Sequence, residues 1–232
     1  MIPLRDSNPT ERFPLVTVLL IVVNSVVFLY ELSLGEKGVQ ALLGAFALVP
    51  ARLVPGSLPV PGAAPVGVTV ITSMFLHGGF LHVIGNMLYL WIFGNNVEDA
   101  MGRVRFVVFY LLCGTTAALG HAFLNLRSAV PMIGASGAIS GVLGAYVLLY
   151  PRARVLTLFT LGFFVRLIEV PAIFVLGFWF ILQFLNALIA SRAGGGVAWH
   201  AHVGGFVAGM LLIGLFKRRT VPFGWRRSSD DL

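Results

Sequence analysis

The chain has 232 residues, of which 58% are apolar and only 11% are charged. Soluble globular proteins carry about 25% charged residues, so this composition excludes a soluble fold of this size. The 27 glycines exceed the usual share and suit helices that pack closely in lipid. We therefore expect an integral membrane protein.

The net charge of +7 does not indicate nucleic acid. The sixteen Lys and Arg residues are scattered between long apolar runs, and they cluster only near the C-terminus, at Lys217, Arg218, Arg219, Arg226 and Arg227. Loops that face an anionic cytoplasmic leaflet explain this distribution better. The single cysteine, Cys113, excludes an internal disulfide and a metal site of several thiolates. We expect the lipid bilayer as a partner, no nucleic acid and no cofactor.

Six apolar segments predict membrane-spanning helices. A bilayer core of about 30 Å needs about 20 helical residues. Five runs approach this length, namely Pro14–Leu34, Phe75–Phe93, Phe106–Leu124, Val170–Ala190 and Trp199–Phe216. A sixth run, Ser136–Tyr150, covers only about 22 Å, so its first turn should lie below the membrane surface. The sequence thus predicts an all-α, six-helix membrane domain at residues 14–216, between an N-terminal tail (1–13) and a basic C-terminal tail (217–232).

Two connections differ from ordinary loops. Residues 35–69 contain five prolines, which makes this segment too broken for a span, yet it is too apolar for a free linker. We expect it to rest in or on the outer leaflet. The apolar stretch Val155–Val165 is too short to cross the bilayer. It should lie at the cytoplasmic interface or pack against the bundle.

The basic residues predict the orientation of the chain. Six spans place both termini on one side, and the opposite side then receives only four of the sixteen basic residues, Lys37, Arg52, Arg127 and Arg192. The remaining twelve put both termini in the cytoplasm by the positive-inside tendency. The first apolar run lacks a small-residue cleavage signature, so we expect it to be retained as a helix. The predicted location is the plasma membrane, as in a bacterial inner membrane.

Ser136 is a candidate nucleophile because of where it lies. Polar residues inside a membrane are functional candidates, although many only bond a neighbouring helix. Ser136 opens the short fourth helix between Gly134 and Gly137, and these glycines let another backbone approach. The helix N-terminus offers free amide donors and a positive dipole end. A serine nucleophile beside an oxyanion site requires these features.

The base for this serine should come from the sixth predicted helix, which begins at the same depth. His200 and His202 are about 200° apart around that helix, so only one of them can face Ser136. His202 shares a face with Gly205 and Gly209, where another helix can pack closely. We therefore expect His202 to be the base and His200 to be interfacial or structural. No acidic residue is expected at this depth, which predicts a Ser-His dyad.

His82 and Asn86 are candidate donors to an oxyanion. They lie four residues apart on one face of the second predicted helix, near the depth of Ser136, and both can donate hydrogen bonds. The alternative is that they satisfy one another or a neighbouring carbonyl. A zinc site is disfavoured, because none of the histidines has the i, i+4 spacing of a helical ligand pair.

Three motifs resemble the rhomboid family of intramembrane serine proteases. They are the run from Gly134 to Gly141, the pair His82 and Asn86, and the run from Ala201 to Gly205. The resemblance implies a six-helix bundle in which Ser136 is the nucleophile, His202 the general base, and His82 and Asn86 the oxyanion donors. It also implies a structural role for Glu98.

Two features depart from the family pattern. Some members carry an aromatic residue four positions after the nucleophile, where this chain has Ser140. Ser140 could instead hydrogen-bond His202, or another residue could stack on that histidine. The outer segment also lacks the Trp-Arg pair of many relatives.

The resemblance implies a protease that cleaves within or beside transmembrane segments of membrane-protein substrates. The rival hypothesis is a catalytically inactive rhomboid-like protein that binds membrane clients. Such a protein would have little need for Ser136 and His202 together, and the sequence has both.

Overall fold

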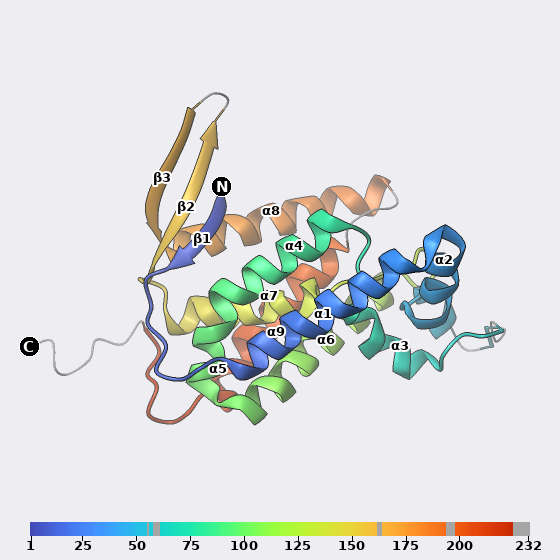
Figure 1. Ribbon diagram of the computed structural model, residues 1–232, viewed down its shortest axis with the longest axis horizontal. Coiled ribbons are helices and arrows are strands. Elements are labelled where there is room, and N and C mark those ends of the chain that lie inside the picture. Colours follow the sequence, from blue (N-terminus) through green and yellow to red (C-terminus); the bar gives the residue numbers. More distant parts are fainter. Residues whose placement is uncertain (55, 58–60, 162–163, 194–197, 225–232) are drawn as a thin grey trace, which may run out of the picture.

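The computed structural model describes residues 1–54, 56–57, 61–161, 164–193 and 198–224. Each predicted span is helical for most of its length, which confirms a helical membrane bundle (Figure 1). The elements are β1 (Ile2–Asp6), α1 (Leu15–Ser33), α2 (Gly35–Phe46), a 3₁₀ turn (Pro50–Leu53), α3 (Val66–Thr72), a second 3₁₀ turn (Ser73–Phe75), α4 (Phe80–Tyr89), a π-helical turn (Leu90–Gly94), α5 (Asn95–Met101), α6 (Arg103–Leu124), α7 (Ser136–Leu149), β2 (Arg154–Leu161), β3 (Phe164–Pro171), α8 (Ala172–Ala193) and α9 (Trp199–Phe216).

The helices divide into long spans and one short central helix. Helices α1, α6, α8 and α9 are long and apolar enough to cross a membrane. A fifth candidate is bent by 84° between Val66–Phe75 and Phe80–Met101. The bend contains Gly79, whose φ of +152° suits glycine and disfavours a side chain. The protein is therefore a multi-pass membrane protein, and the number of six crossings stays a prediction because α7 is short.

The outer segment packs on the bundle as two short helices and a turn. Between α2 and α3, Leu48 pairs with Met132 through two backbone hydrogen bonds of 3.2 and 2.7 Å. The Leu48 side chain is fully buried and belongs to a cluster that includes Ala118 and Ala122 of α6. Residues 35–69 are thereby joined to the loop that leads into α7.

Of the stretch Val155–Val165, residues 155–161 and 164–165 lie in the two strands of a β-hairpin that sequence analysis did not predict. Strands β2 and β3 pair antiparallel, and β1 joins them in the order β1-β2-β3. Figure 1 shows the hairpin projecting from the end of the bundle opposite α2 and α3. Tyr146 Oη of α7 donates to Asp6 Oδ2 at 2.5 Å, and burial raises the pKa of this carboxyl group. A short apolar run does not reveal by its periodicity whether it is strand or helix, which explains the omission.

Two consecutive acids of α5 hold the end of the bundle near the sheet. Glu98 is buried and caps the N-terminus of α1, where helix amides have no partner of their own. Its carboxylate accepts from the amides of Val16 (3.0 Å) and Thr17 (2.7 Å) and from the Thr17 hydroxyl (2.8 Å). These contacts agree with a structural role for Glu98.

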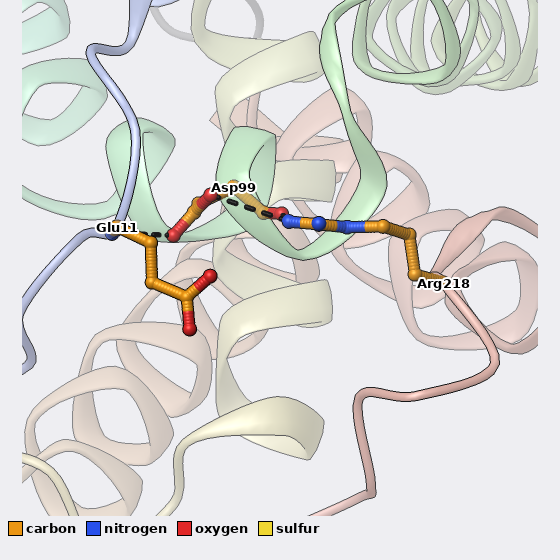
Figure 2. Close-up of polar contacts among 3 residues, drawn as sticks. All are labelled: Glu11, Asp99 and Arg218. Carbon is orange, nitrogen blue, oxygen red and sulfur yellow. Dashed lines mark hydrogen bonds and ion pairs between the residues drawn. The ribbon is translucent and has the colours of Figure 1, made fainter.

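Asp99 joins the two terminal segments of the described chain. Figure 2 shows it between Glu11 and Arg218. Asp99 Oδ2 accepts from the Glu11 amide at 2.8 Å, and Asp99 Oδ1 pairs with the Arg218 guanidinium at 3.2 Å. The segment before α1 and the segment after α9 are thus fixed to α5. Arg226 and Arg227 of the predicted basic tail lie outside the described residues.

Helix α7 is buried along most of its length and contacts α9 backbone to backbone. A Cβ atom added to Gly205 would fall on the Gly137 carbonyl oxygen, and one added to Gly209 would fall on the Gly141 carbonyl oxygen. Small residues allow such close approach between membrane helices. The glycines therefore fix the separation and register of α7 and α9.

This contact predicts an unusual outcome for Gly209→Ala. Within a helix, Gly to Ala usually stabilises by about 0.5–1 kcal/mol. Here we expect the melting temperature to fall, because overpacking costs typically about 1–3 kcal/mol. The matched control is Gly177→Ala on α8, where an added Cβ meets nothing within 4 Å and should leave stability equal or higher. Thermal unfolding of both variants in one detergent tests this, and a Gly209→Ala protein as stable as the control would contradict it.

Candidate active site

The predicted nucleophile and base lie within hydrogen-bond distance. Ser136 is the first residue of α7, and His202 lies in the first turn of α9. His202 Nε2 is 2.8 Å from Ser136 Oγ. Both side chains line a cavity of about 890 Å³. The close contact between α7 and α9 brings together two residues that are 66 positions apart in the sequence.

The loop before α7 requires a glycine. Gly134 has a φ of +115°, and a Cβ atom there would come within 2.6 Å of His82 Nε2. Its amide donates to the Ser73 carbonyl at 2.8 Å, which fixes the approach to α7. The amide of Ile139 donates the first backbone hydrogen bond of α7. The amides of residues 136–138 therefore have no acceptor within the helix. These amides are potential hydrogen-bond donors at the start of α7, where Ser136 lies.

His82 and Asn86 lie on α4 and line the same cavity. Asn86 Nδ2 donates to His77 Nε2 at 3.0 Å, and His82 Nδ1 accepts from the Gly78 amide at 3.4 Å. These bonds join the two residues to Gly78 and His77, not to one another or to a carbonyl, and their role as oxyanion donors stays a prediction. An amide nitrogen carries two N–H groups, so Asn86 keeps a second donor besides the one used by His77.

Two residues behind Asn86 were not predicted to belong to the site. The His77 amide donates to the Glu31 carboxylate at 3.1 and 3.3 Å. Both residues are buried. The sequence placed Glu31 at a helix end and gave His77 no role, because neither has a helical spacing that relates it to Asn86. Only the bend before α4 brings them together.

Helix α8 contacts His202 on the side of its ring that faces away from Ser136. Gln183 Oε1 is 2.7 Å from His202 Nδ1, and the Trp179 ring lies 6.0 Å from the His202 ring at 31°. Ser140 Oγ donates instead to the Ser136 carbonyl at 2.6 Å. An aromatic residue of another helix, Trp179, thus lies beside His202, with its ring tilted and not stacked on it. Its spacing of four residues from Gln183 places both on one helical face, a signal that sequence analysis left unused.

His200 lines the cavity but is not part of the dyad. Its ring is 6.1 Å from the ring of His121, which also lines the cavity. Among the residues that the structure describes, no three His, Cys, Asp or Glu side chains gather closely enough to hold a metal ion. The cavity thus combines a hydroxyl group, a hydrogen-bonded imidazole and several N–H donors.

Comparison with known proteins relates this arrangement to one family. The model of the Rhomboid domain matches residues 66–219. The chain is 33% identical to "Rhomboid protein 1, mitochondrial" of Saccharomyces cerevisiae over 62% of its length, and 31% identical to "RHOMBOID-like protein 1" of Arabidopsis thaliana over 81%. It is also 32% identical to "Rhomboid protease GluP" of Bacillus subtilis over 61%.

The chain covers half or less of these relatives, namely 40%, 50% and 24% of their lengths in the same order. Their sources are a yeast, a plant and a bacterium, and the yeast protein is named mitochondrial, so they do not support a bacterial plasma membrane in particular. The matched region spans more than half of the 232 residues and contains Ser136, His202, His82 and Asn86. The chain therefore belongs to the rhomboid family.

Proposed function

We propose that this protein is an intramembrane serine endopeptidase that cleaves transmembrane or juxtamembrane segments of membrane-protein substrates without a cofactor. The distance of 2.8 Å between Ser136 Oγ and His202 Nε2 carries the proposal. It is the reach that a general base needs to take the serine proton. The similarity to "Rhomboid protease GluP" agrees with this chemistry.

The reaction proceeds through an acyl-enzyme. His202 Nε2 removes the proton of Ser136 as Oγ attacks the substrate carbonyl carbon, and the carbonyl oxygen becomes an oxyanion. The imidazolium then gives its proton to the leaving amine as the peptide bond breaks. A water molecule, deprotonated by His202, attacks the acyl-enzyme and releases the second product.

The oxyanion needs donors that are already aimed at it. The free Asn86 N–H, the His82 ring and the amides at the start of α7 supply them, together with the positive end of the helix dipole. Because the cavity lies among helices, its low dielectric strengthens these interactions. The Asn86–His77 bond holds one of the donors in place before substrate binds.

The dyad generates the first prediction of this proposed function. Ser136→Ala and His202→Ala should each lower the cleavage of a model transmembrane substrate by about 10⁴-fold or more, because nucleophile and base act as a unit. His200→Ala, which changes a neighbouring histidine of α9, should retain activity. Purified Ser136→Ala protein that cleaves at the wild-type rate would remove Ser136 from the reaction.

Labelling with a fluorophosphonate tests the same dyad without a substrate. An activated serine should label in the wild-type protein and in His200→Ala, but not in Ser136→Ala. A folded wild-type protein that neither labels nor cleaves would favour the rival function, a membrane-client binding protein.

The second prediction concerns Asn86. Asn86→Ala should lower kcat by about 10- to 1,000-fold, since removing one oxyanion donor costs on the order of 2.7–4 kcal/mol, and less where others compensate. The matched control is Asn24→Ala, which removes a buried asparagine of α1 whose amide donates to the Leu20 carbonyl. This control should keep its kcat. Kinetics and thermal unfolding of one preparation decide, and a normal kcat in Asn86→Ala would exclude Asn86 from the oxyanion site.

The third prediction concerns orientation. We propose that both termini face the cytoplasm and that α2 lies outside. On a Cys113→Ala background, Gln40→Cys in α2 should react with an impermeant thiol reagent in intact cells, whereas Arg219→Cys after α9 should react only after lysis. Both positions are exposed. The reverse labelling pattern would show that the orientation is opposite to the one proposed.

A further inference from the structure

A mechanism that uses only Ser136 and His202 assigns no role to the contact between Gln183 and His202. Gln183 lies on α8 and is 8% exposed, and its Oε1 atom is 2.7 Å from His202 Nδ1. This is the ring nitrogen that faces away from Ser136, because Nε2 makes the bond to the serine. The imidazole is thus held at both nitrogens, by α7 on one side and by α8 on the other.

We propose that Gln183 is a positioning residue that completes a Ser136–His202–Gln183 triad, an inference that rests on the proposed function. An amide oxygen can only accept a hydrogen bond, so the Nδ1 atom opposite it must carry the imidazole proton. Nε2 is then left with its lone pair directed at the Ser136 hydroxyl, as a general base requires. The opposite tautomer would place a proton between Nε2 and Oγ and block proton removal.

The depth of the site explains why an amide takes this place. In soluble serine proteases, a buried aspartate fixes the tautomer of the histidine and stabilises the imidazolium. A carboxylate inside a membrane protein is costly to bury, whereas a neutral amide needs only its hydrogen bonds. No Asp or Glu lines the cavity among the described residues, while Gln183 does. The Gln183 carbonyl dipole fixes the same tautomer without a buried charge.

The same face of α8 also limits rotation of the imidazole. Trp179 precedes Gln183 by four residues and packs its ring against His202. On the opposite side of α8, Phe178 and Ile181 are about half exposed, as expected for a helix that faces lipid. Because both contacts come from α8, the alignment of His202 depends on how this helix sits against α9.

Kinetics of three variants test the proposal. Gln183→Met preserves length and volume but removes the amide oxygen, and Gln183→Leu gives a second apolar replacement should one of them fail to fold. Both should lower kcat by about 10- to 100-fold with KM near wild type, because the Nδ1–H tautomer loses the acceptor that selects it. Asn186→Leu removes an amide from the same helix outside the cavity and should leave kcat unchanged.

The tautomer itself is measured by ¹⁵N NMR of histidine-labelled protein, with His202→Ala used to assign the signal. Wild-type His202 should carry its proton on Nδ1, and Gln183→Met should shift protons to Nε2. An unchanged kcat or an unchanged tautomer in Gln183→Met would overturn the proposal, as would an equal loss of kcat in Asn186→Leu. A wild-type protein that neither reacts with the fluorophosphonate nor cleaves substrate would instead refute the proposed function. The NMR result would still show whether Gln183 sets the tautomer of His202.

Discussion

The backbone contact between α7 and α9 determines the candidate site. Gly205 and Gly209 have no room for a methyl group against the carbonyls of α7. In lipid, where water exclusion does not drive helix association, such close packing supplies much of the attraction between helices. It also sets the axial register, so that the first residue of α7 meets the first turn of α9. The distance of 2.8 Å between Ser136 and His202 is a consequence of this register.

Two chains of hydrogen bonds flank the cavity, where buried polar groups without partners would be costly. On one side of the cavity, Glu31 binds the His77 amide, and the His77 ring binds Asn86. On the other side, Gln183 binds His202. Each chain joins elements that are distant in sequence, so the site is held in place by α1, α4 and α8 as well as by α7 and α9.

Different contacts hold the two ends of the bundle together. At the end near the sheet, Glu98 accepts from amides at the start of α1, and Asp99 contacts the segments before α1 and after α9. Figure 1 shows α2 and α3 at the opposite end, where the outer segment pairs with the loop before α7. The helices that line the cavity are thus tied to other segments by polar contacts at both ends of the bundle. Helix α8 exposes apolar side chains on its outer face, as α1 and α6 also do.

The sequence alone determined the helical segments, because apolar length and glycine or proline breaks are local properties. It also predicted Ser136, His202, His82 and Asn86 as site residues, because glycine flanks and four-residue spacing restrict which side chains share a face and a depth. It missed the sheet, since an apolar run of this length fits a strand or a buried helix. It assigned no function to His77 or Gln183, because their partners lie on other elements. Only the packing of those elements decided these contacts, since no local periodicity encodes the distance between two helices.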